Sequence, residues 1–246
     1  MTKQLRAVRE VSGPEAFAET FSVSRETLER LKIYESLLQH WQKTINLVAP
    51  GTSDRIWHRH FADSAQIVRL APPAPKTWVD LGSGAGFPGL VAAILLAEPD
   101  NSSKTRFTLI ESDNRKAAFL REVARKVAVP VDILGVRIEA VATRANLGGA
   151  VGGAVAGKSE VGGAVAEKTA DVVSARALAP LTRLLGLALP FSGPNTLCLF
   201  PKGREATREL QAAELQWDFT SELVPSLTEP EARIAVISGC KPKQPA

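Results

Sequence analysis

The sequence predicts an α/β protein whose doubly wound, mostly parallel sheet of seven strands follows a helical extension. From residue 76 onward, short apolar runs rich in β-branched residues alternate with helical patterns. The N-terminal third instead places apolar residues at helical spacing. The segment Pro72-Pro73-Ala74-Pro75 separates the two patterns, because consecutive prolines cannot continue a helix. These three observations define the expected architecture.

Two helices are expected before the proline segment. The first covers residues 24–45, and Ser24 can cap its N-terminus through its hydroxyl. The second covers residues 53–68, with apolar side chains along one side. We therefore assign residues 1–75 to an N-terminal helical extension and residues 76–246 to the main domain.

The seven expected strands are short apolar runs after the proline segment, and helices fit between most of them. The strands are expected at 77–81, 107–111, 131–134, 171–175, 196–200, 219–224 and 233–238. The helices are expected at 89–97, 114–127, 181–189 and 205–215. No helical pattern separates the last two strands, so the final strand is expected to be antiparallel. In such sheets, ligands bind at the carboxyl ends of the strands near the switch point.

Composition narrows the class of protein. The chain has 246 residues, 45% hydrophobic, and a formal net charge of +4, which suits a polyanionic partner without establishing one. No apolar run approaches the roughly 20 residues that span a bilayer, and no signal peptide is recognisable. Cys198 and Cys240 lack the spacing of metal ligands. We expect a cytoplasmic monomer with no metal and no membrane contact.

Residues 148–170 interrupt the strand–helix alternation. A ten-residue near-repeat, VGGAVAGKSE followed by VGGAVAEKTA, fills residues 151–170. Paired glycines disfavour a stable helix or strand, and the repeat is too short for a solenoid. We expect a flexible surface insertion there, since added loop length costs little free energy of closure.

A glycine-rich turn after the first expected strand carries the chemical signal. The stretch Trp78–Gly89 reads WVDLGSGAGFPG, in which Phe87 stands where a dinucleotide-binding fingerprint has its third glycine. The stretch has no Gly-Lys-Ser/Thr, so it is not an NTPase phosphate loop. Glu111 closes the second strand, where a carboxylate can accept hydrogen bonds from both hydroxyls of a ribose. This combination resembles the class I S-adenosylmethionine-dependent methyltransferases, which have a Rossmann-like fold.

Several further blocks resemble the RsmG (GidB) family, in family order and over most of the chain. They read LQHWQKTINL at 38–47, RHFADS at 59–64, FTLIES at 107–112, VRIE at 136–139, SARA at 174–177 and FPKG at 200–203. The resemblance implies transfer of a methyl group from S-adenosyl-L-methionine to N(7) of one guanine in 16S ribosomal RNA. The insertion at 148–170 falls where the family has a shorter connection.

The resemblance also implies roles for individual residues. Those expected to hold the methyl donor are Asp80, Gly82, Gly84, Phe87, Glu111, Ile138, Glu139 and Arg176. Arg176 is expected to line the pocket where donor and guanine meet, and it is the candidate catalytic residue. Lys202, in the loop after the fifth strand, and Arg59 are candidates for RNA contact.

The sequence also allows other roles for these residues. Arg176 could form a structural salt bridge, and Arg59, His60 and Asp63 could lock the N-terminal helices to the core. His60 is expected to be half-buried with satisfied hydrogen bonds, and Trp41 and Trp57 fit core positions. Alternatives to RNA methylation are a methyltransferase for a small molecule or protein, and a ribosome-assembly factor without catalytic activity.

Overall fold

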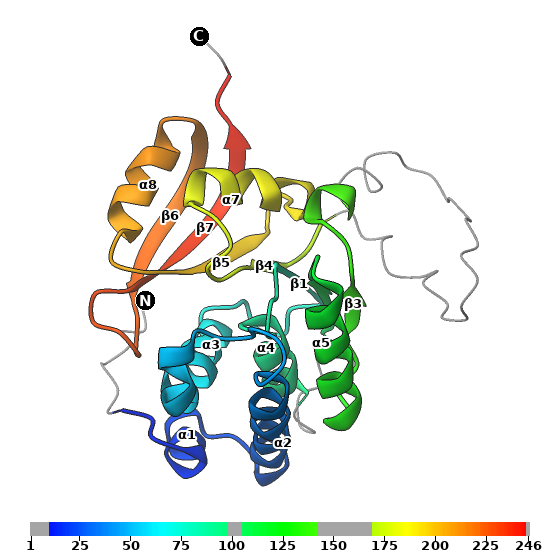
Figure 1. The fold of residues 1–246 in the computed structure, drawn as a ribbon. Coiled ribbons are helices and arrows are strands. Elements are labelled where there is room, and N and C mark those ends of the chain that lie inside the picture. The colour runs from blue at the N-terminus through cyan, green and yellow to red at the C-terminus, as the bar shows by residue number, and fades with distance from the viewer. Residues whose placement is uncertain (1–9, 98–104, 142–168, 245–246) are drawn as a thin grey trace, which may run out of the picture.

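A seven-stranded sheet forms the centre of the protein, and helices cover both of its faces (Figure 1). The computed structural model describes residues 10–97, 105–141 and 169–244, so nearly all of the insertion expected at 148–170 lies outside the described residues. The strand order is β3-β2-β1-β4-β5-β7-β6. The strands are β1 Thr77–Leu81, β2 Arg106–Ile110, β3 Asp132–Leu134, β4 Val172–Ser174, β5 Leu197–Lys202, β6 Trp217–Pro225 and β7 Arg233–Pro242.

The pairing of the last strand confirms the expected topology. Strands β1 to β5 pair in parallel, whereas β7 pairs antiparallel with both β5 and β6. An antiparallel pair needs only a short connection, and β6 and β7 are joined by a short loop, residues 226–232. The order reverses between β1 and β4, which places a switch point beside the glycine-rich turn.

The first expected helix is shorter than its apolar pattern suggested. The hydroxyl of Ser24 accepts a hydrogen bond from the amide of Thr27 (3.1 Å), so α2 (Arg25–Trp41) begins as expected. The expected end at residue 45 is wrong, because Gln42 turns the chain instead. Its side-chain oxygen accepts from the amides of Leu47 and Val48, which offers these backbone groups partners outside a helix. A helix that the sequence did not predict, α1 (Pro14–Phe21), precedes α2.

The second expected helix divides into three different helical segments. A 3₁₀ segment, η1 (Pro50–Arg55), is followed by the π-helical η2 (Trp57–Ala62) and then by α3 (Asp63–Val68). Nearly every side chain of η2 is buried, so its packing does not follow the one-sided pattern of a surface helix. π-Helical turns are uncommon and are frequently found at functional sites.

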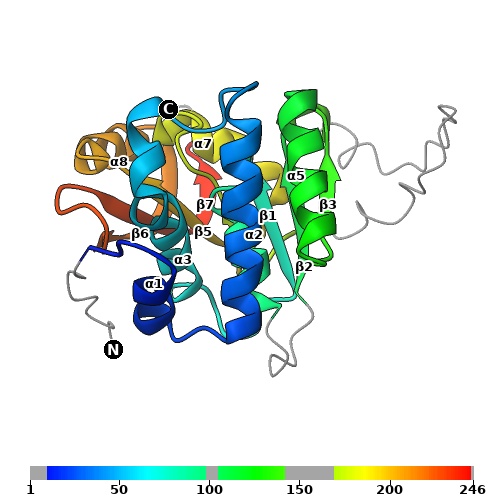
Figure 2. The same ribbon diagram turned by 60° about the horizontal axis from the view of Figure 1, so that its bottom comes forward.

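The N-terminal helices form part of the layer that covers one face of the sheet. Figures 1 and 2 show α2 and α3 on the same side as α4 (Gly89–Leu96) and α5 (Asn114–Lys126). The opposite face carries α7 (Leu181–Ala188), which is followed by the 3₁₀ turn η3 (Leu189–Phe191), and α8 (Ala206–Glu214). The helices of the main domain therefore lie close to their expected ranges.

One hydrophobic core joins the N-terminal extension to the sheet. Phe61 and Tyr34 from the extension are fully buried in the same cluster as Trp78 of β1 and Phe119 of α5. Trp57 is buried and Trp41 packs against this cluster, so both tryptophans are core residues as expected. Because the extension supplies one layer of the core, it is an integral part of the fold. None of the helices in the described ranges is long and apolar enough to cross a membrane.

The shared core predicts that one substitution in the extension weakens the whole molecule. Phe61→Ala should lower the free energy of unfolding by about 3–5 kcal/mol, because it opens a cavity between the extension and the sheet. Unfolding should remain a single transition by both calorimetry and circular dichroism. Leu215→Ala is the control, since Leu215 is 79% exposed and its loss should change stability by about 0.5 kcal/mol or less. Two separate transitions would show that the extension folds independently.

Candidate functional site

The glycine-rich turn follows β1 and bends sharply before α4. Gly82, Gly84 and Gly86 all have positive φ angles, of 63°, 56° and 95°. A Cβ atom at Gly82 would lie 2.6 Å from Leu178, whereas one at Gly84 would have no neighbour closer than 3.8 Å. Gly84 therefore borders open space at the carboxyl end of the sheet, where a ligand can approach its backbone.

Glu111 lies directly against this turn, as the sequence predicted. It follows β2, is 8% exposed, and accepts a hydrogen bond from the amide of Gly84 at 2.8 Å. Its other oxygen accepts from the amide of Asp113 at 2.7 Å. A carboxylate has about four acceptor positions, so two remain for hydroxyl groups such as those of a ribose.

Asp80 is buried beneath the turn. It accepts a hydrogen bond from the hydroxyl of Ser174 (2.6 Å), and Ser174 in turn accepts one from the indole of Trp78 (2.9 Å). A Cβ atom at Gly89 would lie 2.5 Å from the side chain of Asp80, so the first residue of α4 packs on this carboxyl. Burial raises the pKa of Asp80 to about 6, and the hydrogen bond from Ser174 opposes that shift.

Ile138 and Glu139 lie in the segment after β3. Ile138 is 8% exposed and belongs to a hydrophobic cluster with Leu81 and Ile110, which end β1 and β2. It thus forms an apolar side next to the glycine turn, and Glu139 follows it at an exposed position. An apolar surface beside a ribose-binding carboxylate suits an adenine ring.

Together these groups fit S-adenosylmethionine. The donor carries a cationic sulfonium, an ammonium, a ribose and an adenine, but no phosphate. Gly84 leaves room for its chain, Glu111 retains acceptors for its ribose, and the buried Asp80 supplies negative charge nearby. The structure therefore places Asp80 and Glu111 against the glycine turn, and the guanidinium of Arg176 lies over the ring of Phe87, 5.0 Å from its centre.

A cleft of about 680 Å³ lies beside the carboxyl ends of β4 and β5. Its side chains come from the N-terminal segments, from the loop that follows β4, from the end of β5 and the residue after it, from α8, and from the loop between β6 and β7. The residues that line it are Leu47, Val48, Ala49, Thr52, Arg59, His60, Asp63, Arg176, Ala177, Leu178, Ala179, Pro180, Pro201, Lys202, Gly203, Glu209, Thr228, Glu229 and Ala232. This is the position in which such sheets bind substrates.

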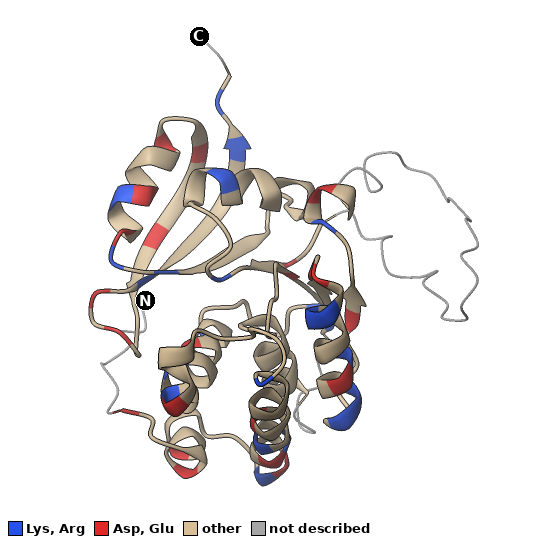
Figure 3. Ribbon diagram, viewed as in Figure 1, with Lys and Arg blue, Asp and Glu red and all other residues tan. Residues whose placement is uncertain are grey.

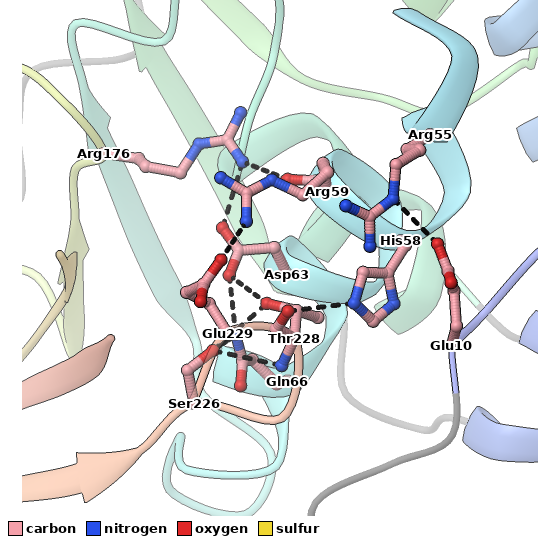
Figure 4. A network of polar contacts seen from close by, with 10 residues as sticks. All are labelled: Glu10, Arg55, His58, Arg59, Asp63, Gln66, Arg176, Ser226, Thr228 and Glu229. Atoms are coloured by element: carbon pink, nitrogen blue, oxygen red, sulfur yellow. Dashed lines mark hydrogen bonds and ion pairs between the residues drawn. The ribbon is translucent and has the colours of Figure 1, made fainter. Parts of the chain in front are cut away.

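Arg176 is fixed at the edge of the cleft by the N-terminal helices (Figure 4). Its guanidinium donates to the carboxylate of Asp63 at 3.0 Å and to the backbone oxygen of Arg59 at 3.1 Å. It also donates to Nδ1 of His60 at 2.9 Å and lies 5.0 Å from the ring centre of Phe87. The salt bridge considered at the outset is present, and it holds the planar group in one orientation.

His60 is neutral and completes this arrangement. Because Arg176 can only donate, Nδ1 of His60 accepts, and its Nε2–H donates to Thr52 at 2.8 Å. Burial, with help from the charges of Arg176 and Arg59, lowers the pKa of His60 to about 3. Its ring stacks on Phe87 at 4.9 Å. His60 therefore has the satisfied hydrogen bonds that were expected, although it is buried rather than half-buried, and Phe87 connects the glycine turn to the cleft.

The two RNA-contact candidates both reach the cleft, but their surroundings differ. The expected loop position of Lys202 is wrong, because β5 continues through Lys202, which pairs with Arg233 of β7. Its side chain is 9% exposed, and its ammonium donates to Glu209 at 2.7 Å and to the backbone oxygen of Ala179 at 2.8 Å. Arg59 is 35% exposed and pairs with Glu229 at 2.6 Å.

Several residues of the site had no signal in the sequence. Tyr34 is fully buried and its hydroxyl donates to the backbone oxygen of Ala85, within the glycine turn. Gln66 and Thr228 both hydrogen-bond to Asp63, although Thr228 lies 165 residues away from it in the chain. The pair between Asp63 and Thr228 joins distant parts of the chain, so sequence spacing could not have found it. The tyrosine at helical spacing on α2 indicated only a core position.

Neither cysteine is placed for nucleophilic chemistry. Cys198 is buried within β5, and burial raises the pKa of its thiol to about 12. Burial also raises the pKa of Cys240, on β7, to about 11. The thiolate is the nucleophilic form, so neither side chain is activated. Within the described ranges, no group of three or more His, Cys, Asp or Glu side chains could hold a metal ion.

The fold and the donor site define a class I S-adenosylmethionine-dependent methyltransferase. Among solved structures, a methyltransferase from Geobacter sulfurreducens shares this fold, with a TM-score of 0.53 and 13% identity over 92% of this chain and 96% of that one. A Corynebacterium glutamicum protein has a TM-score of 0.53 and 14% identity over 91% and 94% of the two chains. The chain belongs to the GidB family, described as rRNA small subunit methyltransferase G, whose model matches residues 27–234.

Relatives with assigned names agree with this family. The ribosomal RNA small subunit methyltransferase G of Parvibaculum lavamentivorans is 46% identical over 230 residues, which cover 94% of this chain and 91% of the relative. The protein of the same name from Paramagnetospirillum magneticum is 48% identical over 218 residues, covering 89% and 91%. The resemblance that the sequence blocks suggested is confirmed.

The geometry at Gly84 predicts loss of donor binding on substitution. Gly84→Val should abolish measurable binding of S-adenosylmethionine in calorimetry, because the side chain enters the open space beside Glu111. The positive φ angle should also cost roughly 1–2 kcal/mol of stability. Gly13→Ala is the control, since Gly13 has an extended backbone and no neighbour within 4 Å of a Cβ. Unchanged affinity in folded Gly84→Val would contradict the donor assignment.

The raised pKa of Asp80 predicts a pH-dependent affinity for the donor. A cationic donor favours the charged carboxylate, so affinity should fall as the pH drops below about 6, by at most about tenfold per pH unit. In the free protein, the raised pKa of Asp80 makes stability depend on pH in the opposite direction from donor affinity. Asp80 contributes most to stability below about pH 4, and this contribution is lost as the pH rises through 6.

Calorimetry between pH 5 and 7 measures the effect on the donor. Asp80→Asn should weaken binding and remove most of the pH dependence, because its amide does not titrate. Asp218→Asn, at an exposed position of β6, should keep the wild-type profile. A wild-type profile in the Asp80 variant would place the titrating group elsewhere.

Proposed function

We propose that the protein transfers a methyl group from S-adenosyl-L-methionine to N(7) of a guanine in 16S ribosomal RNA. The observation that carries this proposal is the contact of Phe87 with both His60 and Arg176. Through it, the donor turn and the cleft share one side chain, so a base in the cleft can reach a donor on the turn. The names of the family and of its relatives supply the class of substrate.

Guanine N(7) needs alignment rather than activation. It carries a lone pair in the plane of the ring and no proton, so no general base is required. S-Adenosylmethionine supplies the methyl group as an electrophile, and the protein contributes proximity and orientation. This agrees with the site, in which the histidine is neutral and the thiols are not activated.

Arg176 is the residue best placed to orient the guanine. Its planar group can donate to O6, the acceptor next to N(7), or to the phosphate of the same nucleotide. N(7) itself must stay free of a hydrogen bond, because its lone pair forms the new bond. Asp63, His60 and the backbone of Arg59 fix the guanidinium from the side of the extension.

The remaining assignments belong to the same proposal. The residues that hold the donor are Asp80, Gly82, Gly84, Phe87, Glu111, Ile138, Glu139 and Arg176. Arg59 contacts RNA at the rim of the cleft. Lys202 can reach a phosphate only if Glu209 releases it, so we give it the smaller role in binding. The enzyme acts as a monomer in the cytoplasm, on 16S RNA or on the small subunit.

The function is tested by mapping N(7)-methylguanine in 16S RNA from cells with and without this protein. One guanine should lose its methyl group when the protein is absent and regain it when the gene is restored. Purified protein should transfer labelled methyl groups to small-subunit particles or to their RNA. If no guanine of 16S RNA loses its methyl group, the protein is instead a methyltransferase for another substrate or an assembly factor without catalytic activity.

Substitutions of Arg176 separate orientation of the substrate from structural support. Arg176→Lys keeps the charge near Asp63 but loses the planar set of donors, so single-turnover methyl transfer should slow by at least about tenfold. Its melting temperature should stay close to that of the wild type. Arg176→Ala should lose both rate and stability, because it leaves Asp63 without its ion pair.

Arg183→Lys, at an exposed position of α7, is the matched control and should match the wild type in both measurements. A wild-type rate for Arg176→Lys would show that only the positive charge matters. Loss of stability without loss of rate in the folded fraction of Arg176→Ala would make the residue purely structural.

A further inference from the structure

The charges of the cleft balance each other. Its cations are Arg59, Arg176 and Lys202, and its carboxylates are Asp63, Glu209 and Glu229, among the described residues that line it. Each cation pairs with one carboxylate, at 2.6 Å for Arg59–Glu229, 3.0 Å for Arg176–Asp63 and 2.7 Å for Lys202–Glu209. A neutral cleft attracts a polyanion weakly, so one of these pairs must open for a phosphate to bind there.

Two of the three carboxylates are held by more than their cation. Asp63 and Arg176 have side chains that are only 18% exposed, and Asp63 also accepts from Gln66 and Thr228. Glu209 accepts from the amide of Leu181 at 2.7 Å as well as from Lys202. Opening either pair would leave buried groups without partners, which is costly.

Glu229 is held differently. Its side chain is 43% exposed, and across the described parts of the chain the structure gives its carboxylate one partner, Arg59. Exposed ion pairs of this kind add little stability. The Arg59–Glu229 pair is therefore the one that can open at the smallest cost.

The loop that carries Glu229 is firmly anchored (Figure 4). The amide of Leu227 donates to Gln66 at 2.8 Å, and the ring of His58 donates to the backbone oxygen of Thr228 at 2.9 Å. The amide of Ala232 donates to the backbone oxygen of Glu229 at 3.0 Å, which closes the turn. Figure 3 shows acidic residues gathered in this loop. The backbone thus presents the Glu229 carboxylate at a defined place on the rim.

We propose that Glu229 occupies the position of an RNA phosphate and thereby sets the selectivity of the cleft for its RNA. Carboxylates and phosphates accept the same hydrogen bonds from a guanidinium. When RNA binds, Arg59 passes from Glu229 to a phosphodiester, and the released carboxylate repels the strand. Every RNA meets this repulsion, but only an RNA with further contacts in the cleft overcomes it. The inference rests on the RNA substrate proposed above.

Binding of a guanine-free RNA tests the role of Glu229. The probe is a fluorescent oligouridylate of about 12 nucleotides, which carries phosphates but no methyl acceptor. Glu229→Gln should bind it about three- to tenfold more tightly than the wild type, because Arg59 is then available without exchange. The slope of log affinity against log salt should steepen by up to about 0.7, the value for one additional phosphate contact on a single strand.

A matched control separates this effect from a general change in charge. Glu10→Gln removes a carboxylate that pairs with Arg55 at 2.7 Å, is more exposed than Glu229, and does not line the cleft. It should bind the oligouridylate like the wild type. If Glu229→Gln and Glu10→Gln bind the oligouridylate with the same affinity, Glu229 does not occupy a phosphate position and the proposal is wrong.

A second comparison asks whether Glu229 acts through Arg59. In an Arg59→Gln background, adding Glu229→Gln should no longer raise the affinity, because no guanidinium remains to be released. If Glu229→Gln raises the affinity equally in both backgrounds, the effect is only long-range repulsion between Glu229 and the RNA. The proposed exchange of Arg59 between Glu229 and a phosphate would then be wrong. A marked fall in the melting temperature of Glu229→Gln would also contradict it, since Glu229 is argued to have only Arg59 as its partner.

Methyl transfer by the wild type distinguishes this proposal from the one on which it rests. If the wild type is active but Glu229→Gln binds the oligouridylate no more tightly than the wild type, only the proposal that Glu229 occupies a phosphate position is overturned. Inactive wild-type enzyme on every small-subunit RNA would overturn the substrate itself.

Discussion

The ion pair between Arg176 and Asp63 is the contact on which the arrangement of the site depends. It joins the end of β4 to the N-terminal extension, and Asp63 simultaneously binds Thr228 in the loop between β6 and β7. Three parts of the chain that are distant in sequence therefore meet at one carboxylate. Both partners are largely buried, so neither could lose the other without leaving a charge in a poorly solvated place.

The same extension shapes the donor side. Tyr34 donates to the backbone of the glycine turn and stacks on Phe87 at 5.5 Å, and His60 also stacks on that ring at 4.9 Å. Space for a Cβ at Gly86 is taken by Tyr34, Leu90 and Leu120, so packing enforces the glycine there. The helices before the sheet thus contact the glycine turn and also line the cleft. They are held in this position by the hydrophobic core that they share with the sheet.

Local sequence signals were sufficient for much of the fold. Short β-branched runs and the absence of a helix before the last strand predicted all seven strands and the antiparallel β7, because these depend on nearby residues. The closeness of Glu111 to the glycine-rich turn was also predictable, since parallel strands end at one edge of the sheet. Expectations were wrong at several element ends, among them those of α2, which stops at Trp41, and β5, which continues through Lys202. At these two ends, the side chain of Gln42 accepts hydrogen bonds from the amides of Leu47 and Val48, and Lys202 pairs with Arg233 of β7.

The sequence by itself determined the class of fold, the position of the glycine-rich turn and the family, because these are recorded in contiguous motifs. Only the tertiary structure decided which cations of the cleft are tightly paired with a buried carboxylate and which are in an exposed pair. Arg59, Arg176 and Lys202 look alike in sequence, yet their exposure and their carboxylate partners differ. Those partners come from other elements of the chain, so no spacing rule could assign them. The energy of a charged group depends on its burial and on the charges around it, and both exist only once the chain has folded.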